Sequence, residues 1–330
     1  MLYTGNASTQ SITGVGFQPD FTWIKRRDDA DKHVLFDAVR AATKYLSTNT
    51  NDAETTDTDS LTAFDSDGFS VGSFDEGNGN LETYAAWNWK ANGAGSSNTD
   101  GTITSSVSAN PGAGFSIISY SGNATAGATV GHGLSEAPEL LIVRGLANSR
   151  DWEVGSSVAT TGTGTFGWTK YLEMNATFAP PAASTIRWND TAPTASVFSL
   201  GTTSQVNDST EDYIAYAFHS IEGYCKVSFY EGNGSDGLFV PCGFRPAWVM
   251  IKNLYTTNDW LMFDNKRSSY NLTDDYLEPN TNIAEATGYG IDLVSNGFNV
   301  HGTNTPVNDN VRNHMFLAYA EFPFKYSPAR

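Results

Sequence analysis

The sequence is poor in cysteine, in charged residues and above all in basic residues. Its 330 residues include 2 Cys, and only 17% are charged, with 19 Lys and Arg against 36 Asp and Glu. Two cysteines are too few for a disulfide framework. A net charge of −17 without a basic cluster argues against nucleic-acid binding, because an anionic surface repels phosphate groups.

The chain also lacks a hydrophobic run long enough to cross a membrane. Residues 1–6 are polar and do not form an apolar leader. We therefore expect no membrane insertion and synthesis in the cytoplasm. Aromatic residues, in contrast, make up 13% of the chain, which supplies large side chains for several small cores.

The most informative pattern that is present is a repeated phrase, Tyr-x-Gly-Asn, at Tyr3–Asn6, Tyr120–Asn123 and Tyr230–Asn233. The first and third copies differ by 227 positions (230 − 3), and the same offset relates Ile24-Lys25 to Ile251-Lys252. A period of roughly a hundred residues allows each unit its own core. We predict homologous units at residues 1–92, 114–222 and 223–330, with a Gly/Ser/Thr-rich structured connector at 93–113.

The segments between turn signals are short, rich in β-branched and aromatic residues, and mostly without helical periodicity. Asp-Gly at residues 67–68 and Asn-Gly at 296–297 are typical of tight hairpins. The fold class predicted is all-β, with three tandem homologous antiparallel β-sandwich domains of jelly-roll or lectin-like type. Ala38 to Leu46 is the best candidate for a short helix, and residues 102–107 for an edge strand.

Few residue patterns point to chemistry. The Asp65-Ser66-Asp67-Gly68 stretch lacks the further ligands of a calcium loop and favours a structural turn. An acid and a base three residues apart occur at Asp37 and Arg40 and again at Asp264 and Arg267, and an internal ion pair is favoured over a grip on a ligand. The five His residues have no metal-ligand spacing and no nucleophile frame. We expect no catalytic, cofactor-binding or metal-binding residues and no cofactor. Pairs of carboxylates suited to glycoside hydrolysis occur somewhere in any chain with 36 acidic residues and carry no specific signal.

Aromatic side chains are the remaining candidates for recognition, because sugars stack on indole and phenol faces. Trp23, Trp87 and Trp248 lie in strand-like phrases and are expected to be buried. The possible ligand-contacting loop aromatics are Trp152, Trp168, Trp188 and Trp260.

The two cysteines, Cys225 and Cys242, flank the turn at residues 232–237. They could pair if this turn closes a hairpin, but small buried thiols are favoured.

Several longer phrases resemble a domain family of tailed bacteriophages, of the marine-phage type, found in virion structural and tail-fibre-associated proteins. These phrases are residues 3–6 with 11–20, 64–69, 187–191, 244–252 and 323–327. The resemblance implies a virion structural protein, made in the host cytoplasm and exposed on the released particle, and it supplies no catalytic residues. Unlike the many relatives that form part of longer proteins, this chain has no shaft-like segment, which suggests a compact knob or surface decoration.

Three functional hypotheses follow. The first is a non-enzymatic bacteriophage virion structural protein, either a tail or fibre component or a capsid-surface decoration, whose partners are other virion proteins. The alternatives are a glycan-binding module for host-receptor recognition and a polysaccharide depolymerase. A homo-oligomer is possible, and the three units could form a pseudo-threefold body or a linear array.

Overall fold

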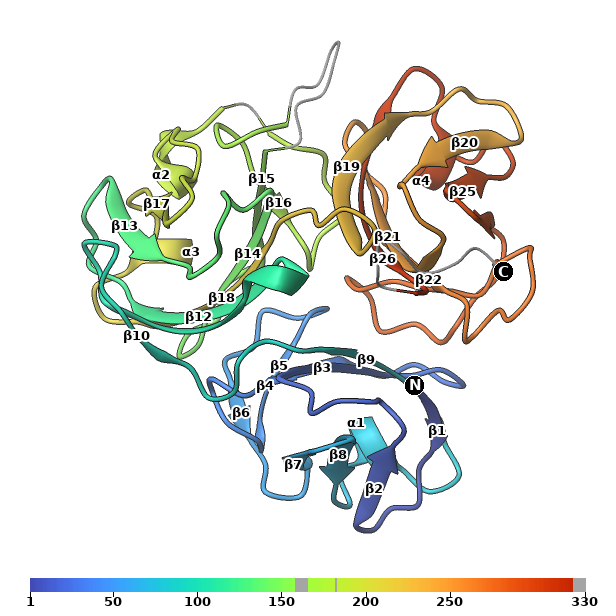
Figure 1. The fold of residues 1–330 in the computed structure, drawn as a ribbon, viewed down its shortest axis with the longest axis horizontal. Coiled ribbons are helices and arrows are strands. Elements are labelled where there is room, and N and C mark those ends of the chain that lie inside the picture. The colour runs from blue at the N-terminus through green and yellow to red at the C-terminus, as the bar shows by residue number, and fades with distance from the viewer. Residues whose placement is uncertain (158–165, 182, 323–330) are drawn as a thin grey trace.

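The computed structural model describes residues 1–157, 166–181 and 183–322 (Figure 1). The prediction of an all-β protein is confirmed, because the described chain consists of strands in antiparallel sheets with a few single-turn helices. Figure 1 shows three lobes around a common centre, which we number 1 (residues 1–92), 2 (93–222) and 3 (223–322). In each lobe a larger sheet packs against a smaller one, which gives the lobes a β-sandwich character.

Lobe 1 has a large sheet in the order β1-β9-β3-β4-β5-β6 and a small sheet in the order β2-β8-β7. Its elements are β1 (Leu2–Thr4), β2 (Gln10–Thr13), β3 (Phe21–Arg26), β4 (His33–Asp37), β5 (Lys44–Ser47), β6 (Thr55–Thr56), β7 (Leu61–Asp65), β8 (Gly68–Val71), α1 (Asp75–Asn78) and β9 (Thr83–Trp89).

Lobe 2 has a large sheet in the order β10-β11-β12-β18-β14-β15-β16 and a small sheet formed by β13 and β17. Its elements are β10 (Ser96–Asn98), β11 (Ser105–Asn110), the 3-10 turn η1 (Pro111–Ala113), β12 (Phe115–Ser121), β13 (Ala128–Gly131), β14 (Leu140–Gly145), β15 (Glu153–Ser156), β16 (Leu172–Glu173), α2 (Thr185–Trp188), β17 (Val197–Leu200), α3 (Ser204–Asn207) and β18 (Asp212–Phe218).

Lobe 3 has a large sheet in the order β19-β26-β21-β22-β23 and a small sheet in the order β20-β25-β24. Its elements are β19 (Cys225–Glu231), β20 (Leu238–Pro241), β21 (Pro246–Asn253), β22 (Trp260–Asp264), β23 (Tyr276–Leu277), β24 (Ile291–Val294), β25 (Gly297–Val300), α4 (Thr305–Asn308) and β26 (Asn313–Ala320).

The Tyr-x-Gly-Asn phrase has the same structural role in each lobe, namely to attach the first strand of the repeat to a single-turn helix. The Tyr230 hydroxyl donates to the carbonyl of Val307 at 2.6 Å. A Cβ added at Gly232 would lie 2.2 Å from the carbonyl oxygen of Asp309, so only glycine allows this approach. Tyr3 and Tyr120, with Gly5 and Gly122, make the corresponding contacts in lobes 1 and 2.

A buried asparagine completes this attachment. In lobe 3 the side-chain oxygen of Asn308 accepts hydrogen bonds from the main chain of Asn233 and Gly234, and its amide donates to the carbonyls of Ser235 and Gly302. Asn78 and Asn207 bond in a similar way in the other lobes. The phrase therefore recurs in the three lobes because its residues make the same contacts in each, and buried main-chain groups need these hydrogen-bond partners.

The same register recurs at the centre of each large sheet. In β3, Trp23 lies opposite Leu35 on one side and Trp87 on the other. The corresponding rows are Ile142 with Val154 and Tyr216 in lobe 2, and Met250 with Met262 and Leu317 in lobe 3. These rows define equivalent positions without any appeal to sequence alignment.

The central strands are buried on both faces, because each large sheet packs on its small sheet and also on the other lobes. Ile24, for example, packs into the interior of lobe 1, whereas its neighbour Trp23 packs into a core shared by all three lobes. This shared core has side chains from every lobe, among them Trp89, Phe218 and Trp248. The double burial explains the nearly continuous apolar runs in β14 and β21.

Three local expectations can be compared with these elements. Ala38 to Leu46 does not form a helix: it makes turns and enters β5, since the strand pairs with β4. The edge strand expected at residues 102–107 is wrong in bounds and in place, because the strand formed is β11 (Ser105–Asn110) and it pairs with both β10 and β12 in the large sheet of lobe 2. Cys225 and Cys242 are buried free thiols. Cys225 begins β19 and Cys242 follows β20, and these two strands lie in different sheets and do not form one hairpin.

Candidate functional site

The three seams, as we call the interfaces between pairs of lobes, are built from equivalent residues. Trp152 of lobe 2 donates its indole N–H to the carbonyl of Ser47 in lobe 1 at 2.8 Å, and Trp260 of lobe 3 donates to that of Glu173 in lobe 2 at 3.2 Å. At the equivalent position of lobe 1, His33 approaches the main chain of Glu278 in lobe 3 without a full hydrogen bond. Each lobe thus directs one ring to the main chain of another lobe: lobe 2 to lobe 1, lobe 3 to lobe 2, and lobe 1 to lobe 3.

A buried cation accompanies each ring on the neighbouring strand. Lys25, Arg144 and Lys252 are all 0% exposed. Lys252 donates to the carbonyls of Thr177 and Asn258, and Arg144 to that of Asp52 across the seam between lobes 1 and 2. Burial lowers the pKa of Lys252 to about 7 and that of Lys25 to about 8.

The two acid–base phrases are buried ion pairs, as the sequence predicts. The distance from Arg40 Nε to Asp37 is 2.5 Å, and that from Arg267 Nε to Asp264 is 2.6 Å. Burial alone would raise the pKa of Asp264, but the charge and hydrogen bonds of Arg267 outweigh it and lower this pKa.

Each pair also accepts a hydrogen bond from the adjoining lobe. The hydroxyl of Tyr216 in lobe 2 donates to Asp37 at 2.8 Å, and the indole of Trp87 in lobe 1 donates to Asp264 at 3.1 Å. Tyr216 and Trp87 are equivalent in register to Leu317, and the residue at the Asp37 position in lobe 2 is Ser156. The seam between lobes 2 and 3 therefore lacks the acid and the donor together.

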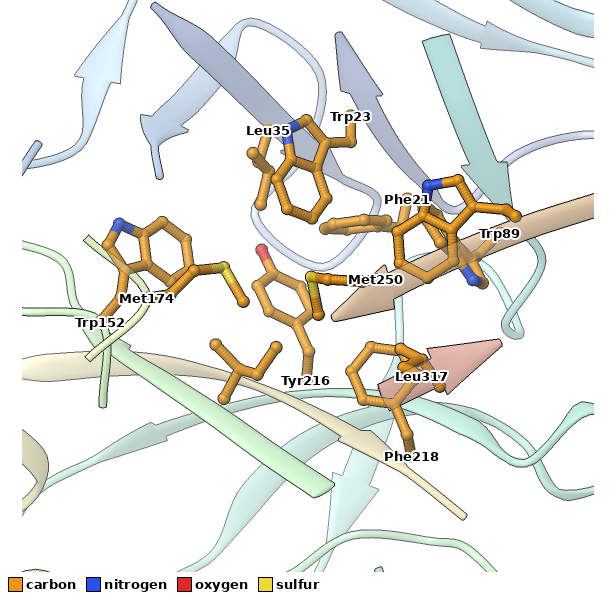
Figure 2. A pocket seen from close by; sticks show the side chains of 12 residues that line it. Phe21, Trp23, Leu35, Trp89, Trp152, Met174, Tyr216, Phe218, Met250 and Leu317 are labelled. Carbon is orange, nitrogen blue, oxygen red and sulfur yellow. The ribbon is translucent and has the colours of Figure 1, made fainter. Parts of the chain in front are cut away.

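A small cavity of about 20 Å³ lies in the shared core, and Figure 2 shows side chains from all three lobes converging on it. Trp23, Trp152 and Met250 are three of the twelve side chains that line it. Its lining is apolar, so it offers no partners to a water molecule. We assign it to packing and not to recognition.

Lobe 2 differs from the other lobes in the interior of its own sandwich. Glu153 stands opposite Val143, where the equivalent residues are Val34 and Leu261. Similarly, Gly155 occupies the position of Phe36 and Phe263.

The space above Gly155 is filled by two indoles. A Cβ at Gly155 would lie 2.6 Å from Trp168 and 2.8 Å from Trp188, and the two indoles pack edge to face with centroids 5.9 Å apart. Neither indole N–H has a hydrogen-bond partner within the part of the chain that the structure describes.

A buried charged cluster lies on the same strand. Glu153 and Arg187 form an ion pair at 3.1 Å, and the guanidinium lies 3.9 Å from the centroid of the Tyr171 ring. Burial raises the pKa of Glu153 to about 8 despite Arg187, and burial raises the pKa of Glu173, its cross-strand neighbour, to about 7. Clustered carboxyls with raised pKa values are common at functional sites and in structural ion pairs alike.

A groove of about 480 Å³ opens at the surface of lobe 2, and Trp168 is part of its lining. Its lining includes Glu136, Glu139, Ser157, Trp168, His219 and Ser220. Glu139 accepts from the main-chain N–H of Ser220 at 2.6 Å and also from the Ser220 hydroxyl, which fixes the carboxylate in place. We consider this groove the candidate binding site of the chain.

The four tryptophans singled out from the sequence do not lie in exposed loops. Trp152, Trp188 and Trp260 are at most 1% exposed, and Trp168 is 7% exposed. The expectation of exposed aromatic faces is thus wrong: Trp152 and Trp260 are covered by the neighbouring lobes, and Trp168 and Trp188 cover Gly155. Of these four, Trp168 alone lines the surface groove.

Sequence reasoning missed Glu139, Glu153, Arg187 and His219 as residues of interest. The strand register singles out Glu153, because this charged residue stands where lobes 1 and 3 have the aliphatic residues Val34 and Leu261. Within the described residues, no group of three or more His, Cys, Asp or Glu could hold a metal ion. The described helices are all too short to cross a membrane.

The fold and its seams define an all-β protein in which three β-sandwich lobes share one core. The chain belongs to the family described as a domain of unknown function, DUF7483, whose model matches residues 1–323. The match therefore runs through all three lobes. No curated protein matches the chain.

Proposed function

We propose that this protein is a non-enzymatic structural component of a bacteriophage virion, in the tail or fibre or as a decoration of the capsid surface, that acts in assembly and display. The observation that carries the proposal is the shared core. It joins three lobes through equivalent contacts and leaves most of the chain's large side chains, including seven of its eight tryptophans, buried in packing. Such an arrangement suits a rigid body that withstands conditions outside the cell.

In this proposal the lobes are three tandem homologous antiparallel β-sandwich domains, related by duplication of one unit. The recurrence of Tyr-x-Gly-Asn, of the buried Asn and of the strand register supports this interpretation. The seams support a pseudo-threefold body over a linear array, because each lobe contacts both of the others. The partners in this role are other virion proteins.

Localisation on the particle tests the proposal. Purified virus particles would be examined by mass spectrometry and by reconstruction from electron micrographs, and density for a three-lobed body should appear on the capsid surface or the tail. Absence of the protein from particles that are otherwise complete would overturn the proposal.

A further inference from the structure

The surface groove of lobe 2 combines carboxylates, hydroxyls, an imidazole and an indole. Two of its walls are the segments 136–139 and 192–193, and Trp168 and His219 lie between them. Trp168 belongs to the stretch between β15 and β17, which also supplies Trp188 and Arg187 to the interior of the lobe. Through Trp168, the groove thus adjoins the pair of indoles that fills the space above Gly155.

The groove offers a preorganised acceptor and an unused polar group. Glu139 is held by two hydrogen bonds from Ser220. His219 is 5% exposed, its Nδ1 contacts the carbonyl of Ser220, and its Nε2 has no hydrogen-bond partner among the described residues. A buried polar atom without a partner is unusual in a folded protein, and a bound ligand, water or ion is one way to satisfy it.

The chemistry of the lining selects the class of ligand. Glu136 and Glu139 accept hydrogen bonds, and the exposed hydroxyl of Ser157 can donate or accept them. Pro193 and the small exposed part of Trp168 provide apolar surface. No Lys or Arg lines the groove, and the chain carries a net charge of −17, so an anionic ligand would be repelled. A volume of about 480 Å³ lies within the range of small-molecule sites.

We propose that this groove binds an uncharged saccharide, whose hydroxyl groups donate to the Glu136 and Glu139 carboxylates and whose apolar C–H face packs on Pro193 and on the small exposed part of Trp168. This inference goes beyond the structural role, since a protein can occupy a virion without binding a sugar. Particle localisation and sugar binding therefore fail independently.

The test is binding of the full chain to an array of immobilised glycans that includes neutral, amino, sialylated and uronate-containing structures. The wild-type protein should bind neutral glycans, and Glu139→Gln should weaken this binding at least about tenfold, because a charged acceptor makes stronger hydrogen bonds than an amide. Ala192→Trp should block the groove and abolish binding while it leaves Glu139 and His219 intact. Ala192 is exposed, so this variant should fold.

Glu231→Gln is the matched control, since Glu231 is an exposed carboxylate at the end of β19 in lobe 3. It should bind as the wild type does, and the melting temperatures of all three variants would be compared with that of the wild type. Failure to bind any neutral glycan overturns the proposal, as does binding that survives Ala192→Trp or is confined to anionic glycans. Binding of a cationic peptide in place of glycans would identify a different class of partner and also overturn it.

Discussion

At the scale of single residues, the buried polar side chains carry the information that distinguishes this fold from a generic β-protein. Asn78, Asn207 and Asn308 are 0% exposed, and each fixes a loop through its amide group. Lys25, Arg144 and Lys252 are equally buried and donate mainly to carbonyl groups. Both groups are costly to bury, so their partners decide whether they stabilise the protein.

The first prediction concerns Asn308→Ala. This substitution removes the partner of two main-chain N–H groups and two carbonyl groups inside lobe 3. We expect a loss of about 3 kcal/mol in the free energy of unfolding, because each buried group left unsatisfied costs about 1–3 kcal/mol. Denaturation by guanidinium chloride measures it. The control is Asn310→Ala at an exposed position, and an equal effect of the two substitutions would contradict the assignment.

The second prediction concerns the pH dependence that Lys252 causes. Its pKa is about 7 in the folded protein against the ordinary value of 10.5, so between these values the unfolded chain binds the proton and the folded chain does not. The contribution of Lys252 to stability should therefore rise with pH from 7 to 10.5, by about 1.4 kcal/mol per pH unit. It should be constant below pH 7.

Lys252→Met tests this sign. The difference in unfolding free energy between wild type and variant should shift in favour of the wild type as the pH rises from 7 to 9.5. The exposed Lys90→Met is the control. A difference that does not change with pH would show that Lys252 titrates normally.

At the scale of elements, strand β15 shows that lobe 2 differs from the other lobes in its side chains although its sheet has the same register. The register of β15 against β14 matches that of β4 and β22 in their own sheets, yet its interior face bears Glu153 and Gly155. Indole rings and the ion pair with Arg187 replace an aliphatic side chain and a phenyl ring. The strand pairing tolerates this because main-chain hydrogen bonds do not depend on the side chain.

The third prediction is a double-mutant cycle on this ion pair. Glu153→Leu alone leaves Arg187 buried without its carboxylate and should cost about 3–5 kcal/mol. Glu153→Leu combined with Arg187→Leu should recover most of that loss, because leucine occupies the equivalent position in lobe 3 as Leu261 and a buried ion pair can often be replaced by apolar residues. Arg187→Leu alone completes the cycle, and urea denaturation gives the free energies of unfolding of the wild type and the three variants. Additive losses in the double variant would mean that the two side chains act independently.

At the scale of the whole molecule, the three seams use equivalent positions but differ in the side chains that occupy them. The seams that lobe 1 forms with lobes 2 and 3 each contain a buried Asp–Arg pair that accepts a hydrogen bond from across the seam. Lobe 1 and lobe 3 are further joined by the Arg27–Glu285 ion pair at 2.7 Å. Between lobes 2 and 3, Ser156 and Leu317 replace the acid and the donor.

The fourth prediction is that the seam between lobes 2 and 3 opens more readily than the other two. Three main-chain N–H groups report on the three seams: Asn258 bonds to Thr177, Asp31 to Asn282 and Glu54 to Leu146. Hydrogen exchange followed by mass spectrometry should give the fastest exchange for peptides that contain Asn258, since local opening follows the weakest set of contacts. Slower exchange there than at Asp31 and Glu54 would contradict the ranking.

The sequence by itself determined the all-β class, the three copies of the Tyr-x-Gly-Asn unit and the two internal ion pairs, because turns, strand patterns and contacts between near neighbours are encoded locally. In β9, Tyr84 and Ala86 alternate with Trp87 and Trp89, and the two pairs pack into different cores. Only the tertiary structure decided what covers the second face. Alternation shows that a face is apolar but not which partner buries it, so Trp152 and Trp260 were expected in loops and lie instead against other lobes. The contacts that bury them join residues about a hundred positions apart, and no local pattern records such pairs.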